Sequence, residues 1–373
     1  MNIIINAHIR QKNPLSLPFL RMTSADWAII TTWKILTCQQ GIYSMLYVDN
    51  HNLHNPALNL AVEEYLIRNI APEEELLLFY INEPSIIIGR NQNTIEEINV
   101  DYVREHHLHV VRRLSGGGAV YHDLGNLNFS FIAPNSPGNF HNFLKFTAPV
   151  IEVLQSLGVP AELSGRNDIV VDERKISGNA QYVAGPRMVS HGTLLYQSDL
   201  DQVGQALRVK PSKIESKGIK SVRSRVANIT DWLAQPLDIL GFRQQILYGI
   251  FQSEQDIPQY ILTDQDWENI QHLSEERYQT WEWNYGRSPA FNLRRETRYP
   301  GGTIEALLEV ENGCLQQIKF YGDFFGQRDV SELEALLTGC IYTPDALQKR
   351  MEQVEIGQYF SQYPAGELVT FLY

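Results

Sequence analysis

Residues 112–128 read RRLSGGGAVYHDLGNLN. Three successive glycines, Gly116 to Gly118, follow a predicted strand, and without Cβ atoms their backbone N–H groups can approach a ligand closely. The segment lacks the Gly-Lys-Ser/Thr ending of a phosphate-binding P-loop, and Tyr121 stands where a dinucleotide fingerprint starting at Gly116 requires glycine. Those two motifs are set aside. Taken alone, the segment is compatible with a ligand-binding loop or with a plain turn in a sheet.

Helices and short strands surround this segment. Asn55-Pro56 supplies a helix start, and apolar residues then recur at helical spacing from Leu58 to Leu66. A second helix is predicted over 142–157, ending at Gly158. Composition, length and flanking Gly or Pro residues predict the following strands: 76–81, 85–88, 108–114, 168–171, 174–178 and 191–197.

The pattern of predicted helices and strands changes beyond about residue 284. Two strand-like runs, 304–311 and 314–321, flank Asn312-Gly313, which is a strong hairpin signal. A helix ending at Gly339 and a last helix opening with Thr343-Pro344 are expected to follow. We therefore predict a small α+β domain over 285–373, joined through 281–289 to a larger domain over 45–284.

Composition limits the class of protein. With 373 residues, 43% of them hydrophobic, the chain can bury a sizeable core and should hold more than one domain. It contains no apolar run long enough to predict a membrane span. The three cysteines form neither a disulfide framework nor a zinc pair, so a reducing cytosol fits best. The net charge of −12 argues against general nucleic-acid affinity.

Residues 1–44 differ from the rest of the chain. They carry a net charge of +3, which leaves −15 for the remaining residues. We interpret this extension as an appendage outside the fold, because Pro14 and Pro18 break any long amphipathic helix there. An organelle-targeting peptide is the alternative.

Positive charge is also concentrated in residues 208–225, which hold seven cations and one anion. This segment is either a solvated charged loop or a functional one that attracts anionic groups. Just upstream, an Asn-Asp turn and two predicted strands should bring Lys175 back beside Asn167 and Asp168. Most lysines are solvated surface cations, but this one lies in a polar stretch of small residues, which favours a site.

Together these segments resemble the lipoate–protein ligase family in its two-domain bacterial form. The resemblance runs through nearly the whole chain from Met45. It rests on these ordered matches: NLAVEE at 59–64, GRNQ at 89–92, the segment 112–126, GRND at 165–168, KISG at 175–178, HGTLL at 191–195, KGIKSVRSR at 217–225 and WEWNYG at 281–286.

The resemblance implies a fold and a reaction. The fold class is α/β (α+β): a large mixed-sheet catalytic domain of the biotin/lipoate ligase type with a small C-terminal domain. Such ligases join lipoate to ATP, supplied with Mg²⁺, release pyrophosphate, and pass the acyl group from lipoyl-AMP to a lysine of a lipoyl-domain acceptor. Implied acceptors are 2-oxoacid dehydrogenase acyltransferase subunits and the glycine cleavage H protein. No tightly bound cofactor, membrane or nucleic-acid partner is expected, and the expected location is cytoplasmic, or mitochondrial if residues 1–44 are a targeting peptide.

The same matching implies residue roles. Lys175 is the expected catalytic cation, contacting both ATP and lipoate. The other nucleotide-binding residues are Arg113, Gly118, Ala119, Val120 and Tyr121. The other lipoate-binding residues are Ser115, Gly116, Gly117 and His122. The loop expected to close over the adenylate carries Lys217, Lys220, Arg223 and Arg225. Asn167, Asp168 and His191 are expected to support the site.

Alternatives remain for two of these residues and for the function. His122 either bonds acyl or phosphate oxygens or braces the loop, and Asp168 either helps to hold Mg²⁺ or only forms a turn. An octanoyl or lipoyl transferase that works without ATP is the enzymatic alternative. A transferase with a covalent cysteine is disfavoured, because residues 45–284 contain no cysteine. A non-catalytic binder of lipoyl domains and a nucleic-acid-binding module are the competing classes.

Overall fold

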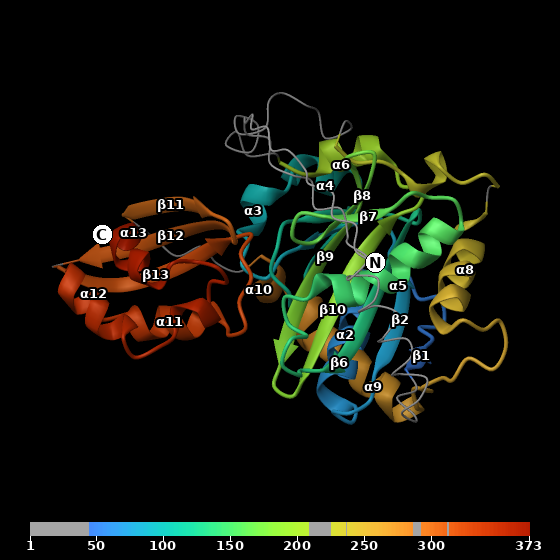
Figure 1. Cartoon of the computed structure of the whole chain (residues 1–373). Coiled ribbons are helices and arrows are strands. Elements are labelled where there is room, and N and C mark those ends of the chain that lie inside the picture. The colour runs from blue at the N-terminus through green and yellow to red at the C-terminus, as the bar shows by residue number, and fades with distance from the viewer. Residues whose placement is uncertain (1–44, 209–224, 236, 286–291, 312) are drawn as a thin grey trace, which may run out of the picture. The chain divides into compact units, whose positions relative to one another are not determined.

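The computed structural model describes residues 45–208, 225–235, 237–285, 292–311 and 313–373, which belong to one compact unit (Figure 1). The interpretation of residues 1–44 therefore lies outside the described residues. None of the described helices combines the length and apolar character needed to cross a bilayer.

A seven-stranded mixed sheet forms the centre of the larger part, with strand order β1-β2-β6-β10-β9-β8-β7. β1 and β2 run parallel and the other neighbours antiparallel, which confirms the predicted mixed sheet. The strands are β1 (Leu46–Val48), β2 (Leu76–Ile81), β6 (Asn126–Pro134), β7 (Glu162–Ser164), β8 (Asp168–Val171), β9 (Arg174–Ala184) and β10 (Arg187–Leu195).

Both faces of this sheet are buried by helices. Alternate residues of a strand point to opposite faces, so Leu77 and Phe79 of β2 join one core and Leu76 and Leu78 join another. The first core packs against α5 (Phe143–Ser156) and α8 (Ile239–Phe251). The second packs against α2 (Pro56–Asn69) and α9 (Asp264–Leu273), and Figure 1 shows these helix layers around the sheet.

A smaller sheet presents the glycine-rich segment. Its order is β4-β3-β5, with β3 at Ser85–Ile88, β4 at His109–Arg112 and β5 at Val120–His122. Ile87 faces the core of α2, whereas Ile86 and Ile88 face α4 (Val100–Glu105) and α6 (Leu200–Ala206). Since β4 leads into β5 through residues 113–119, both ends of the glycine-rich segment are anchored in strands.

The C-terminal part has its own core, as predicted. A three-stranded antiparallel sheet, β11-β12-β13, packs against helices on one face. Thr343-Pro344 does begin a helix, α12, but the prediction that this helix is the last one is wrong, because α13 follows it. The elements are β11 (Leu293–Tyr299), β12 (Gly302–Glu311), β13 (Cys314–Gly322), α11 (Val330–Leu337), α12 (Pro344–Met351), η4 (Ile356–Gln358), η5 (Ala365–Glu367) and α13 (Leu368–Leu372).

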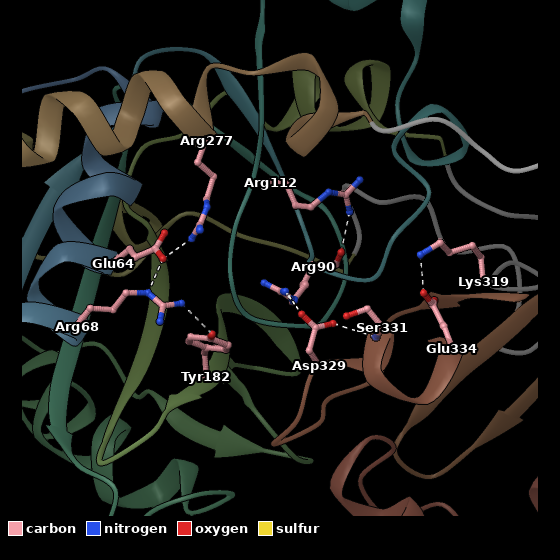
Figure 2. A network of polar contacts seen from close by, with 10 residues as sticks. All are labelled: Glu64, Arg68, Arg90, Arg112, Tyr182, Arg277, Lys319, Asp329, Ser331 and Glu334. Atoms are coloured by element: carbon pink, nitrogen blue, oxygen red, sulfur yellow. Dashed lines mark hydrogen bonds and ion pairs between the residues drawn. The ribbon is translucent and has the colours of Figure 1, made fainter. Parts of the chain in front are cut away.

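Residues 281–285, expected to belong to a linker, are instead an ordered helical segment. α10 (Trp281–Asn284) binds the side chain of Arg112, whose Nε donates to Trp283 O at 2.9 Å. The same guanidinium donates to the carbonyls of Gly89, Arg90 and Gln92. Arg112 is thus a structural brace, as Figure 2 shows for its bond to Arg90. The remaining elements are α3 (Thr94–Glu97), η2 (Ile229–Asp231) and the π turn η3 (Ser274–Tyr278).

Three ion pairs also shape this region (Figure 2). The buried carboxylate of Glu64 on α2 forms ion pairs with Arg68 and Arg277. Arg90 forms an ion pair with Asp329 of the C-terminal part. Burial raises the pKa of Asp329, but the Arg90 charge and the hydrogen bonds from Ser331 outweigh it, so the pKa lies below its usual value.

Candidate active site

A cavity of about 290 Å³ lies between the glycine-rich segment and strands β9 and β10. It brings together residues from both sheets and from the C-terminal part. Its lining combines cationic, polar and apolar side chains: Leu60, Tyr80, Ile87, Arg113, Gly117, Gly118, Ala119, Val120, His122, Asn128, Arg166, Asn167, Asp168, Lys175, Gly178, Asn179, Ala180, His191, Gly192, Thr193, Asp323 and Phe325.

Lys175 reaches this cavity because β8 and β9 form a hairpin. Its Nζ lies 2.8 Å from Asp168 Oδ1, which confirms the predicted proximity of the two residues. Both side chains keep more than a third of their surface exposed, so the ammonium remains open to a ligand. A Cβ on Gly178 would lie 2.8 Å from the same Nζ, and the glycine therefore makes room for the lysine.

Glycine is required at two positions around the glycine-rich segment. Gly117 has a φ of +92°, a backbone conformation that residues with a Cβ atom rarely adopt. A Cβ on Gly89 would lie 1.9 Å from the carbonyl oxygen of Gly117. The close approach of these two backbones fixes the course of the loop at the cavity wall.

Arg113 supports this loop from inside. Its guanidinium donates to the carbonyls of Ile87, Gly116 and Gly118 and, through Nε, to Ser115 Oγ. Burial lowers its pKa to about 10, so it stays protonated at neutral pH. Most of its N–H groups are thus used within the protein, although Arg113 also lines the cavity as the prediction requires.

Side-chain alternation on β5 separates the residues that were predicted to bind ligands. Val120 and His122 line the cavity, whereas Tyr121 points to the opposite face and donates to Gln202 Oε1 at 2.7 Å. Ser115 and Gly116 also lie outside the cavity lining. A Cβ on Gly116 would meet Phe324 O of the C-terminal part at 2.2 Å. Gly117, Gly118 and Ala119 do line the cavity.

A buried chain of polar groups links Ser115 to Glu63. Ser115 Oγ lies 2.7 Å from His191 Nε2, and His191 Nδ1 lies 2.9 Å from both Glu63 oxygens. Because a carboxylate only accepts, Nδ1 carries the proton and Nε2 is free to accept from the serine hydroxyl. His191 is therefore held firmly at the cavity wall, consistent with its predicted supporting role.

The C-terminal part also contributes to the cavity, which the sequence did not predict. Asp323 and Phe325 line it. Arg166 places its guanidinium carbon 4.4 Å from the centre of the Phe325 ring and donates to Gly301 O at 2.5 Å. The GRND motif therefore contacts the C-terminal part as well as Lys175.

Only the two end residues of the basic segment, Arg208 and Arg225, are described. Lys217, Lys220 and Arg223 lie outside the described residues. Arg225 is described, and its carbonyl accepts a hydrogen bond from Lys175 N at 2.8 Å. The chain that follows the basic segment thus runs directly beside Lys175.

No three His, Cys, Asp or Glu side chains cluster as metal ligands in the part of the chain that the structure describes. Asp168 and Asp323 both line the cavity. Mg²⁺ is commonly held by one or two carboxylates together with substrate phosphates, and these side chains fit that arrangement.

Family models match both parts of the chain. Residues 55–251 match the lipoyl protein ligase A/B catalytic domain. Residues 288–372 match the bacterial lipoate protein ligase C-terminus. The class defined by these matches is that of two-part lipoyl ligases.

Whole-chain relatives agree. The chain is 55% identical to lipoate-protein ligase LplJ of Bacillus subtilis over 88% of its length and all of the relative. It is 51% identical to lipoate–protein ligase 1 of Staphylococcus aureus, with the same coverage. The chain therefore belongs to the lipoate–protein ligase family, which confirms the resemblance drawn from its motifs.

Solved structures support the fold. The structure of P. falciparum LipL1 in complex with lipoate has a TM-score of 0.69 at 24% identity and covers 84% of this chain and 95% of that one. A lipoate-protein ligase A bound with ATP has a TM-score of 0.56 at 30% identity and covers 65% of this chain and 99% of that one. A bipartite ligase from Thermoplasma acidophilum, described with its E2 lipoyl domain, has a TM-score of 0.58 at 30% identity, covering 67% and 100%.

Proposed function

We propose that this protein is an ATP-dependent lipoate–protein ligase that forms lipoyl-AMP, releases pyrophosphate and transfers the lipoyl group to a lysine of a lipoyl domain. The observation that carries the proposal is the exposed Lys175 ammonium in a cavity walled by Gly117 to Val120. The family membership and the ATP-bound relative support it.

The first step must bring two anions together, the lipoate carboxylate and the α-phosphate. A cation between them removes the repulsion and stabilises the charge that develops on the phosphate. Lys175 is suited to this role because its flexible ammonium can donate three hydrogen bonds, and its ion-pair partner Asp168 is itself partly exposed. We assign the nucleotide to the wall formed by Arg113 and Gly118 to Val120.

The second step transfers the acyl group to an amine. As the acceptor lysine attacks, an oxyanion grows on the acyl carbonyl, and the Lys175 ammonium can stabilise it. ATP arrives with Mg²⁺ as a substrate complex, which Asp168 and Asp323 would help to hold. Arg225 and the preceding basic residues Lys217, Lys220 and Arg223 are proposed to close over the adenylate.

Lipoate ligases act on lipoyl-domain proteins, and the Thermoplasma relative is described with its E2 lipoyl domain. For this chain we propose acyltransferase subunits of 2-oxoacid dehydrogenases and the glycine cleavage H protein as acceptors. We propose a cytoplasmic location, with mitochondrial import as the alternative if residues 1–44 direct targeting. Microscopy of the tagged full chain and of a chain beginning at Met45 distinguishes these locations.

One assay tests the function directly. An apo lipoyl domain is incubated with the protein, lipoate, ATP and Mg²⁺, and its mass is then measured by mass spectrometry. We expect the mass to increase by one lipoyl group. Omission of ATP is the control. Modification without ATP from an acylated carrier protein would instead indicate a transferase, and no modification under any condition would refute the proposal.

A further inference from the structure

A buried chain of amides fixes the protonation of His122. The side chain of Asn50 donates to Asn59 Oδ1 at 3.0 Å, and Asn59 donates to Asn82 Oδ1 at 2.9 Å. Asn82 Nδ2 lies 3.0 Å from His122 Nδ1. All three amides and the imidazole are buried. We call Asn50, Asn59 and Asn82 the amide relay.

Backbone carbonyls set the direction of the amide relay. Leu53 O accepts from both Asn50 Nδ2 at 3.1 Å and Asn59 Nδ2 at 3.0 Å. Because a carbonyl only accepts, the nitrogen of each amide must face it. Asn59 therefore presents N–H to Asn82, and Asn82 presents its own N–H to His122. The Nδ1 atom of His122 must accept, so the proton of the neutral ring lies on Nε2.

The ring also stays neutral. Burial, as the largest cause, and the nearby charge of Arg113 together lower the pKa of His122 to about 3. The Nε2 atom is fully buried and has no hydrogen-bond partner among the residues that the structure describes. Since His122 lines the cavity, this N–H is a donor that only a bound molecule can satisfy.

The position of His122 identifies which part of a ligand it meets. The Lys175 ammonium lies close to Gly178, whereas Ala180, two residues further along β9, pairs with His191, which lines the cavity together with His122. Two strand residues span about 7 Å, so the cationic and histidine ends of the cavity are separate. Leu60, Ile87 and Val120 line the cavity with apolar groups. An acid whose carboxylate lies at Lys175 can therefore extend its hydrocarbon chain along these apolar groups toward His122.

We propose that His122 donates its Nε2–H to a sulfur of the dithiolane ring and thereby selects lipoate over acids with a plain hydrocarbon end. This inference rests on the proposed function, since it places the lipoate carboxylate at Lys175. Divalent sulfur is a weak acceptor, but an octanoate chain offers none and leaves the buried N–H unpaired. His122 is thus a specificity-determining residue, and the amide relay consists of positioning residues.

The test compares lipoate with octanoate. Lipoate-dependent and octanoate-dependent pyrophosphate release are measured for the wild type, His122→Phe and Asn82→Leu. His122→Phe should lower kcat/KM for lipoate about five- to tenfold and change that for octanoate by less than about twofold. Asn82→Leu keeps the imidazole but frees its tautomer, so it should reduce the preference in the same direction by less. Asn139→Leu removes a buried amide outside the cavity and is the matched control, with an unchanged ratio.

Equal losses of kcat/KM for lipoate and octanoate would overturn the inference. They would show that His122 contacts the carboxylate, which both acids share, or that its role is structural. An unchanged ratio in His122→Phe would overturn it too. If His122→Phe does not fold, the ratio of kcat/KM for lipoate to that for octanoate in Asn82→Leu provides the test. Calorimetric binding of the two acids to each protein separates the two proposals. A wild type that binds lipoate but releases no pyrophosphate refutes the ligase function, while the binding ratio still tests the role of His122.

Discussion

Replacing His122 by Phe should change how stability depends on pH. The native pKa is about 3, well below the ordinary histidine value of about 6.5, because burial and the neighbouring charge of Arg113 disfavour the imidazolium. The unfolded chain therefore binds its proton at a higher pH than the folded one. Between these two values, lowering the pH stabilises the unfolded state, so the contribution of His122 is fully present above pH 6.5 and is lost as the pH falls toward 3.

The size of the effect follows from the same two values. Between pH 7 and pH 5 the wild type should lose about 2 kcal/mol of unfolding free energy through this residue. A phenylalanine has no proton to bind, so His122→Phe should lack this loss. The difference in stability between wild type and variant should accordingly move by about 2 kcal/mol in favour of the variant over this range.

Urea unfolding of both proteins at pH 7, 6 and 5, followed by circular dichroism and tryptophan fluorescence, measures this difference. Coincident transitions from the two probes are needed for a two-state free energy. Nitrogen NMR of labelled histidine provides a direct control, with His122 expected to show a protonated Nε2 and an unprotonated Nδ1 from pH 8 to pH 5. Parallel stability curves, or an imidazole that titrates near pH 6.5, would refute the argument.

Three further changes test the site and its scaffold. Lys175→Ala should lower pyrophosphate release on the order of a hundredfold or more while melting near the wild-type temperature, because its ammonium is partly exposed. Gly117→Val should cost about 1–2 kcal/mol of stability and weaken lipoate binding, since φ is +92°; Gly118→Ala, where a Cβ meets no atom within 4 Å, is the matched control for both measurements. Glu64→Ala should lower the free energy of unfolding in urea by about 3–5 kcal/mol, because it removes the buried carboxylate with which two cations are paired. Arg68→Ala should lower it by under about 1 kcal/mol, because the Arg68 side chain is 45% exposed.

Much of the fold could be predicted because it follows local rules. The strands at 76–81, 85–88 and 168–171 were predicted with their observed bounds, since apolar runs and flanking turn residues define them. β10 was predicted to begin at His191 but begins at Arg187. Arg187 and Ser190 interrupt the apolar pattern, and only the folded chain supplies a carbonyl, Ala71 O, for the buried guanidinium.

The site could be predicted in part for the same reason. Lys175 and Asp168 meet within one hairpin, so their proximity follows from neighbouring sequence. Tyr121 was predicted to bind nucleotide together with its neighbours, yet strand alternation turns it away from the cavity. Glu63, Asn82 and Phe325 reach the site region from distant segments, and no spacing in the sequence links them to the glycine-rich segment.

The amide relay shows why residues that orient the site could not be predicted from the sequence. Asparagines in a helix and after a strand are common. Asn59 opens the NLAVEE match at 59–64, but neither that match nor the sequence around Asn82 indicates a contact with His122. A buried polar network stabilises a protein only when its members are satisfied, because each unpaired group keeps its full desolvation cost. Here Leu53 O orders the network at one end, where Asn50 Oδ1 has no partner among the described residues, and the Nε2–H of His122 is unpaired at the other end. A ligand atom that accepts this bond recovers that cost, so the unpaired donor is explained by binding and not by folding.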